Sequence, residues 1–142
     1  MAADKTTIAK QFISAIPHAK ALGMEFTKIE SGVAEMRMPY DERFVGDPKT
    51  GVIHGGAVSA LLDTTCGAAV MSHPKAPGGT ATIDLRIDYM RAATPGQALR
   101  TRAHCYRITK NVAFVRAEAL DDDDEVPVAT AAGAFTVEGL TK

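Results

Sequence analysis

The segment His54-Gly55-Gly56 directly precedes the most apolar stretch of the chain. It contains a first candidate functional group, the backbone amide of Gly55. A glycine pair lets a substrate approach the backbone, although each glycine costs roughly 1 kcal/mol inside a helix. The first amides of a helix have no intrahelical acceptor and carry the positive end of its dipole. The Gly55 amide could therefore stabilise a carbonyl oxygen that gains negative charge. A structural role is an equal alternative, because glycines also permit a close helix-strand crossing.

The second candidate is Asp63, which lies between Leu62 and Thr64 in the same apolar stretch. Burying a carboxylate without partners costs several kcal/mol or forces the acid to protonate. Either a neighbour such as Thr64, Thr65 or a backbone amide satisfies this side chain, or a function retains it. Asp63 is thus a candidate catalytic carboxylate. The alternative interpretation is that it is a structural aspartate held by hydrogen bonds.

The spacing of Gly55 and Asp63 limits how they could cooperate. They are eight positions apart, which corresponds to ~12 Å along a helix and roughly 80° around it. One substrate carbon cannot touch both groups of the same chain. If both act on one carbonyl, Asp63 must come from a second copy, and a twofold interface would hold two equivalent sites. The hypothesis predicts a homo-oligomer, without a choice between dimer and tetramer.

The elements that must position these groups follow from hydrophobic periodicity. An apolar helix is predicted over Ala57–Met71, and Thr6 or Thr7 would cap a short N-terminal helix. This helix has an apolar stripe of Ile8, Phe12, Ile13 and Ile16. Alternation with a period of two predicts a hairpin that turns at Ser31-Gly32 and then, after the central helix, four strands in meander order. These later strands are expected over 82–89, 99–108, 112–120 and 126–137.

The predicted fold class is α+β, with an antiparallel sheet of about six strands wrapped around one long central helix. An all-apolar helix needs apolar sheet on most of its sides, and this arrangement supplies it. The length of 142 residues predicts a single domain over residues 1–142. The acidic run Asp121–Asp124 is expected at a solvated hairpin tip rather than in a metal site.

Composition excludes some classes of partner. The formal net charge is -1, so no global field favours nucleic acid or an anionic membrane. No stretch approaches the ~20 apolar residues of a membrane span, and the start of the chain lacks the apolar core of a signal peptide. We therefore predict a cytoplasmic protein that binds neither nucleic acid nor membranes.

The cysteines and the remaining histidines do not suggest chemistry. Cys66 and Cys105 lie in apolar segments and are expected to be reduced, buried thiols. His18, His73 and His104 follow no ligand spacing, so we predict no metal. No cofactor is expected either.

The motif around the candidate groups resembles that of a known family. Thr50-Gly51-Val52-Ile53-His54-Gly55-Gly56, followed by Leu61-Leu62-Asp63, is similar to the signature of hotdog-fold acyl-CoA thioesterases of the phenylacetate-degradation (PaaI-like) type. They belong to the 4-hydroxybenzoyl-CoA thioesterase superfamily. The stretch Asp88-Tyr89-Met90-Arg91-Ala92 resembles the family's next landmark. The resemblance implies a hotdog fold and hydrolysis of an acyl-CoA or aryl-CoA thioester.

The resemblance also implies roles for particular residues. Asp63 would be the nucleophile or the general base, and the Gly55 amide would face the thioester oxygen. His54 would orient the loop or polarise the carbonyl, with a purely structural cap as the alternative. These acid and amide roles are divided between two subunits in the family.

Three further positions are predicted to contact substrate: Gly56, Thr82 and Asp47. Thr82 matches a Ser or Thr that positions water in relatives. Strict alternation would turn Thr82 outward together with Asp84, so a bulge or a strand start is needed to aim it inward. Asp47 stands where many relatives have an Asn, and an ionised Asp cannot donate a hydrogen bond to a carbonyl.

Two alternative functions remain open at this stage. One is a noncatalytic acyl-CoA binding or sensor protein, and the other is a hotdog hydratase or dehydratase that leaves the thioester whole. The sequence does not identify the acyl group. Several cations could meet the phosphates of coenzyme A: Arg91, Arg102, Arg107, Lys110 and Arg116.

Overall fold

The computed structural model describes residues 5–76 and 78–138, so the predicted domain of residues 1–142 extends beyond the described residues at both ends. The helices are α1 (Lys5–Ser14), α2 (Pro17–Ala21), the short 3-10 helix η1 (Glu42–Phe44) and the central α3 (Gly55–Ser72). The strands are β1 (Glu25–Glu30), β2 (Val33–Met38), β3 (Val45–Asp47), β4 (Val52–Ile53), β5 (Thr82–Tyr89), β6 (Leu99–Ile108), β7 (Val112–Leu120) and β8 (Ala129–Thr136).

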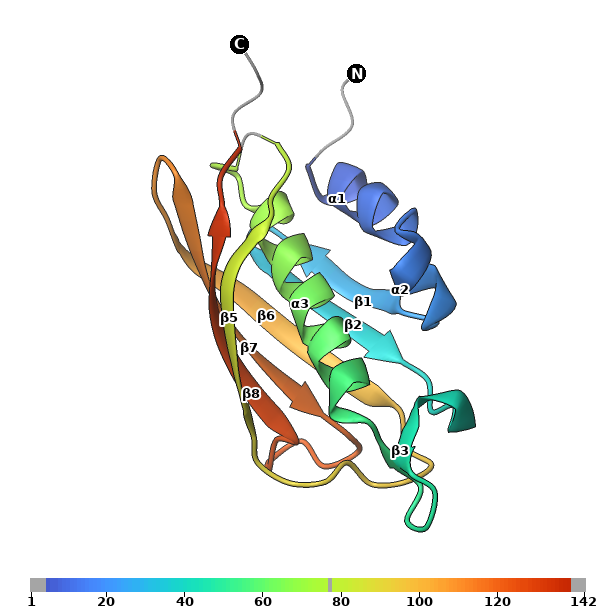
Figure 1. Cartoon of the computed structure of the whole chain (residues 1–142). Helices are drawn as coiled ribbons and strands as arrows, with labels where there is room; N and C mark the ends of the chain where they lie inside the picture. Colours follow the sequence, from blue (N-terminus) through green and yellow to red (C-terminus); the bar gives the residue numbers. More distant parts are fainter. Residues whose placement is uncertain (1–4, 77, 139–142) are drawn as a thin grey trace.

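One antiparallel six-stranded sheet has the order β1-β2-β6-β7-β8-β5, and β3 and β4 form a separate small hairpin. Figure 1 shows α3 lying along the sheet between β5 on one side and α1 with α2 on the other. The predicted meander is correct for β6, β7 and β8 but wrong for β5, which pairs with β8 at the edge. Alternation reveals which face of a strand is buried, whereas the choice of neighbouring strand depends on the path of the chain after α3.

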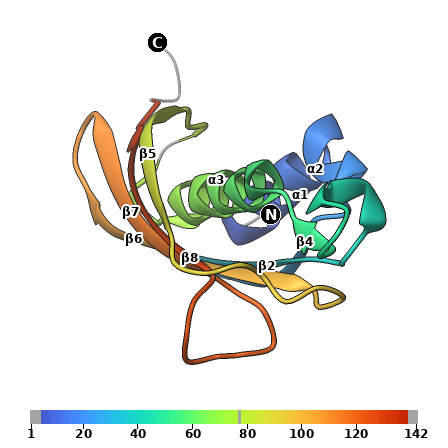
Figure 2. The same ribbon diagram turned by 60° about the horizontal axis from the view of Figure 1, so that its bottom comes forward.

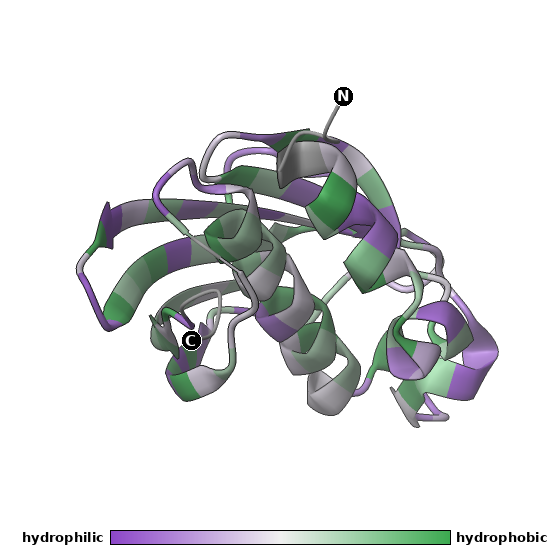
Figure 3. Cartoon of the chain, turned by 90° about the horizontal axis from the view of Figure 1, so that it is seen from above, coloured by the Kyte–Doolittle hydropathy of each residue, from purple (hydrophilic) through white to green (hydrophobic). Residues whose placement is uncertain are grey.

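The sheet curves around α3, as Figure 2 shows, so the helix is covered on most sides. The hydropathy colouring of Figure 3 shows α3 as mostly apolar or neutral. Buried side chains of α3 include Leu61, Leu62, Cys66 and Val70. They face the inward residues of the sheet, among them Met36, Met38, Leu99, Ala103 and Val115. The predicted wrap of six strands around one central helix is confirmed.

The N-terminal helix differs from its prediction in two respects. α1 begins at Lys5, before either threonine that was expected to cap it. Only part of the predicted stripe is buried: Ile13 is in the core, while Ile8 and Phe12 are 50% and 56% exposed. The helix packs through Ala9 and Ile13, and in a helix a one-residue step rotates the side chain by about 100° onto another face.

The acidic run is solvated only in part. Asp122, Asp123 and Asp124 are exposed, but Asp121 is 1% exposed. The Arg91 guanidinium donates to both oxygens of the Asp121 carboxylate, at 2.6 and 2.7 Å, and Thr94 adds hydrogen bonds from its backbone and hydroxyl. The expectation of a fully solvated tip was therefore wrong for Asp121, because a partner 30 residues away compensates its burial.

Candidate active site

The first turn of α3 is organised by the imidazole of His54. His54 is the N-cap residue, and its Nδ1 accepts a hydrogen bond of 2.8 Å from the Gly56 N–H. A Cβ at Gly56 would lie 2.9 Å from this Nδ1, so glycine leaves room for the imidazole. The His54 N–H donates to the Phe44 carbonyl at 2.8 Å. His54 therefore caps the N-terminus of α3, which is the structural alternative that the sequence left open.

Gly55 follows the cap and is the first residue of α3. No hydrogen bond of residues 5–76 and 78–138 uses the Gly55 N–H as donor, as expected for the first turn of a helix. The Gly55 carbonyl accepts a 2.9 Å hydrogen bond from the Tyr89 hydroxyl. Gly55 and Tyr89 line a cavity of about 300 Å³, whose other lining includes Val52, Ile53, Val58, Met90, Arg91 and Val128. Gly55, whose N–H has no acceptor among the described residues, therefore lines a largely apolar cavity.

Asp63 lies two turns further along α3, partly buried, and its partner comes from β5. The Thr82 hydroxyl donates to one carboxylate oxygen, Oδ1, at 2.7 Å. In the described part of the chain no hydrogen bond reaches the other oxygen, Oδ2. The pairing of β5 with β8 shifts register between Thr82 and Asp84. This irregularity is the bulge required to turn Thr82 toward the helix.

The neighbours that the sequence suggested for Asp63 are engaged elsewhere. The Thr64 hydroxyl donates to the Ala60 carbonyl, and the Thr65 hydroxyl donates to the Leu61 carbonyl and pairs with Thr101. Both donations run back along the helix to the residue four positions earlier, a contact typical of helical threonines. Sequence proximity therefore pointed to the wrong hydroxyls, and the contact with Thr82 depends on the tertiary fold.

Both cysteines are buried and free. Burial, and next the negative charge of Asp63, raises the pKa of the Cys66 thiol to about 12. Burial also raises the pKa of Cys105. A thiol must lose its proton to act as a nucleophile, so neither cysteine is suited to nucleophilic catalysis.

The remaining predicted positions lie in different surroundings. Asp47 is exposed at the β3–β4 turn, where its carboxylate accepts from the Lys49 N–H at 3.0 Å. Gly56 has its N–H engaged by the His54 cap. The structure brings Thr82 to Asp63, and it keeps His54, Gly55 and Gly56 together at the start of α3.

Three of the cations considered for coenzyme A phosphates already have protein partners. Arg91 donates to Asp121 and to the carbonyls of Ala92 and Val126 through all three guanidinium nitrogens. Arg102 forms ion pairs with Glu35, Glu118 and Asp124. Arg116 lies over the Tyr106 ring, 4.6 Å from its centroid.

Two contacts near the candidate groups were not predicted from the sequence, although Arg91 itself was one of the cations considered for coenzyme A phosphates. The Tyr89 hydroxyl donates to the Gly55 carbonyl, whereas the sequence placed Tyr89 only in the stretch 88–92 that resembles the family's landmark. The Arg91–Asp121 pair borders the same cavity through Arg91. No local pattern links two residues 30 positions apart, so the pair had no signal in the sequence.

Within residues 5–76 and 78–138, no three His, Cys, Asp or Glu side chains are grouped so that they could hold a metal ion. Of the helices described, none is long and apolar enough to span a membrane.

Residues 50–128 match the family described as the thioesterase superfamily. The chain is 27% identical over 145 residues to the medium/long-chain acyl-CoA thioesterase YigI of Salmonella typhimurium, covering 92% of this chain and 91% of the relative. It superposes on a crystal structure of a Pseudomonas aeruginosa protein with a TM-score of 0.82 and 39% identity, covering 92% and 97% of the two chains. The PaaI protein of the Escherichia coli phenylacetic acid degradation operon shares the fold, with a TM-score of 0.82, 21% identity and coverage of 96% and 97%.

The fold and the match define a class: a hotdog-fold thioester hydrolase. The chain belongs to the thioesterase superfamily. The resemblance inferred from the His-Gly-Gly and Asp motif is confirmed, and so is the expected class of enzyme.

Proposed function

We propose that this protein hydrolyses acyl-CoA thioesters, with Asp63 as the general base or nucleophile and the Gly55 amide as the oxyanion donor. The thioester carbonyl oxygen would accept from the Gly55 N–H. The Asp63 carboxylate would either take a proton from the water that attacks the carbonyl carbon or attack that carbon itself. In the first route the tetrahedral intermediate expels the coenzyme A thiolate, which takes up a proton, and a free acid is left. In the second route the Asp63 carboxylate displaces the coenzyme A thiolate, which takes up a proton, and water then hydrolyses the acyl-Asp63 anhydride to the free acid and the regenerated carboxylate.

The observation that carries this proposal is that only one of the two Asp63 carboxylate oxygens accepts a hydrogen bond from the described residues. Thr82 fixes one oxygen at 2.7 Å, and the other has no hydrogen-bond donor among the described residues. No buried side-chain oxygen of the described residues lacks a partner, so the second oxygen of the partly buried Asp63 is accessible to water or substrate. One oriented oxygen and one available oxygen suit a general base or a nucleophile.

We propose further that each site is shared between two subunits. Gly55 and Asp63 are on one helix, ~12 Å apart along its axis, so a single chain cannot bring both to one carbonyl. β5 is an edge strand, and Ile83, Tyr89 and Met90 on or next to it are 56%, 53% and 55% exposed. An exposed apolar edge strand favours association. A second copy that covers β5 would bring its own α3 close to the first.

Thiol release from a panel of acyl-CoA and aryl-CoA thioesters tests the activity. A thioesterase releases free coenzyme A in proportion to turnover. A hydratase or dehydratase would change the acyl group without thiol release, and a binding protein would do neither. A panel with no thiol release at saturating substrate would contradict the proposal.

Mixing two inactive variants tests the shared site. Gly55→Pro deletes the amide and is compatible with the first helical position, since His54 has the extended angles φ -59° and ψ 137° that precede proline well. Asp63→Asn deletes the acid. In a dimer with shared sites, refolding the two variants together should restore about a quarter of wild-type activity, because half of the dimers are mixed and each has one intact site. No recovery would contradict a shared site.

A further inference from the structure

The peptide unit that joins Gly55 to Gly56 is held at both of its polar ends. Its carbonyl, on Gly55, accepts from the Tyr89 hydroxyl at 2.9 Å, and its N–H, on Gly56, donates to His54 Nδ1 at 2.8 Å. One bond comes from a side chain of β5 and the other from the N-cap residue. The first turn of α3 is thereby fixed from two sides.

This fixation matters because the turn consists of two glycines. Glycine has more backbone freedom than any other residue, so a helix that begins with a glycine pair has a loosely defined first turn. The unpartnered Gly55 N–H is separated from the fixed peptide unit only by its own Cα. Holding the Gly55 carbonyl therefore limits the directions in which the Gly55 N–H can point.

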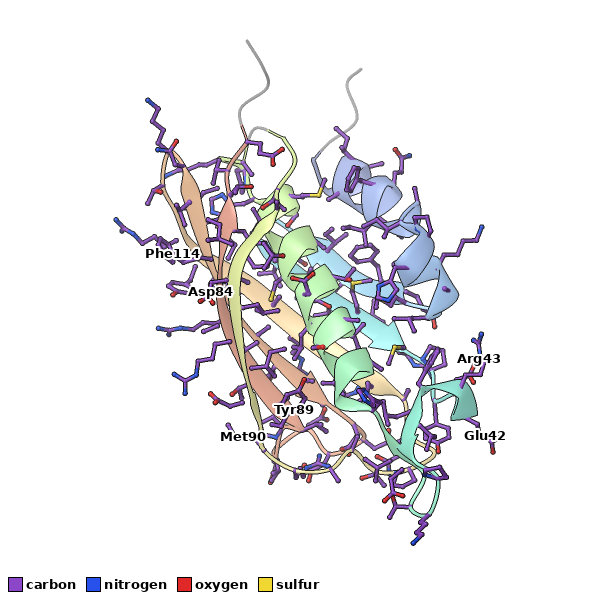
Figure 4. The ribbon with its side chains drawn as sticks, viewed as in Figure 1. Glu42, Arg43, Asp84, Tyr89, Met90 and Phe114 are labelled. Carbon is purple, nitrogen blue, oxygen red and sulfur yellow. The ribbon has the colours of Figure 1, made fainter. Side chains whose placement is uncertain are left out.

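Tyr89 is placed to hold this carbonyl without being part of the core. Its side chain is about half exposed, and a Cβ built on Gly55 would lie 3.4 to 3.6 Å from the Tyr89 ring and hydroxyl. Figure 4 labels Tyr89 and Met90 near the end of β5 that lies beside the first turn of α3. Tyr89 and Gly55 line the same cavity.

We propose that Tyr89 is a positioning residue: its hydroxyl, by holding the Gly55 carbonyl, aims the Gly55 N–H at the place where the thioester oxygen develops charge. This inference rests on the proposed function of Gly55. A donor placed before the reaction stabilises developing charge without reorganisation, whereas a mobile donor must first be ordered. Tyr89 acts through Gly55 and takes no proton.

The variant Tyr89→Phe keeps the ring in the cavity wall and removes only the hydroxyl. We expect kcat for thiol release to fall about tenfold while KM changes less than twofold. A less ordered Gly55 N–H stabilises the oxyanion of the transition state less well but has little effect on substrate binding. The ¹⁵N–¹H resonance of the Gly55 amide should shift or broaden. A variant with wild-type kcat and an unchanged Gly55 resonance would overturn the inference.

Tyr40→Phe is the matched control. The Tyr40 hydroxyl also donates to a glycine carbonyl, that of Gly51 at 2.7 Å, but it does not contact the 55–56 peptide unit. It should leave the Gly55 resonance in place and reduce kcat less than twofold. If Tyr40→Phe lowers kcat as much as Tyr89→Phe, the loss comes from a general destabilisation of the fold rather than from the 55–56 peptide unit, and the inference is wrong.

The two readouts separate this inference from the proposed function. Absence of thiol release by the wild-type protein would contradict the function alone. The Gly55 resonance would still report whether Tyr89 orders the first turn of α3.

Discussion

Two aspartates have environments in the structure that are the reverse of what their sequence neighbours suggest. Asp63 comes from the most apolar helix, and Asp121 comes from an acidic run. Yet Asp121 is 1% exposed with its carboxylate surrounded by donors from Arg91, Thr94 and the Asp123 backbone. Asp63 is partly exposed, and among the described residues only Thr82 donates to it. The number of donors around each carboxylate, rather than the polarity of its sequence neighbours, distinguishes the two environments.

The electrostatics of Asp121 agree with this distinction. The Arg91 guanidinium, assisted by hydrogen bonds from Asp123 and Thr94, holds the pKa of Asp121 well below its usual range. Such a carboxylate stays ionised at neutral pH, and donors from Arg91 and Thr94 already use both of its oxygens. Its ion pair holds the connection after β5, because Arg91 lies two residues beyond the end of that strand.

The largest expected effect is that of Asp63→Asn on turnover. Loss of the base or nucleophile should lower kcat by about 10³-fold or more. The amide oxygen of the substituted side chain can still accept from Thr82, so the melting temperature should stay near that of the wild type. Thiol-release kinetics and thermal unfolding measure the two quantities. Normal activity per folded molecule with reduced stability would make Asp63 structural and remove the contrast with Asp121.

Asp121→Asn should show the reverse pattern. Removing one partner of a buried ion pair leaves the Arg91 charge without compensation, and we expect the free energy of unfolding to fall by about 3 kcal/mol. Turnover per folded molecule should change far less than in Asp63→Asn. Urea unfolding measures the loss, and Asp122→Asn at the exposed neighbouring position is the control, with a change within about 0.5 kcal/mol. Equal losses in both variants would show that the Asp121 contacts do not stabilise the fold.

Thr82→Val tests the hydrogen bond that Thr82 donates to Asp63. Valine has nearly the same shape as threonine but cannot donate, so the carboxylate loses its orientation and kcat should fall about tenfold. Thr82 is exposed, and stability should change by less than about 0.5 kcal/mol. Thr82→Ser retains a hydroxyl and should recover most of the activity. If serine fails to do so, the methyl group rather than the hydrogen bond is what matters.

The smallest effect is a dependence of stability on acid pH. Since the pKa of Asp121 is lower in the folded protein than in the unfolded chain, the pair contributes stability above about pH 4, the ordinary pKa of an aspartate. That contribution decreases as the pH falls toward the pKa of the folded state. The difference in unfolding free energy between wild type and Asp121→Asn should therefore be constant from pH 7 to about pH 5 and decrease at lower pH. An increase on acidification would contradict the assigned direction.

Much of the fold could be predicted from the sequence because local patterns carry it. The hairpin at Ser31-Gly32 and the strands β6 and β7 have their predicted positions, since alternation and turn residues act over a few residues. The apolar central helix predicted the wrap of the sheet around it. The neighbour of β5 and the exposed faces of Ile8 and Phe12 were mispredicted, because they depend on how distant elements meet.

For the candidate site, the sequence by itself determined which groups are unusual: a glycine pair at a helix start and an acid in an apolar helix, eight positions apart. The tertiary structure decided their partners. Thr82 reaches Asp63 through a bulge, Tyr89 holds the Gly55 carbonyl, and Arg91 occupies Asp121. Residue type and spacing are properties of one segment, whereas a hydrogen bond between segments 19 to 34 residues apart exists only after the chain has folded.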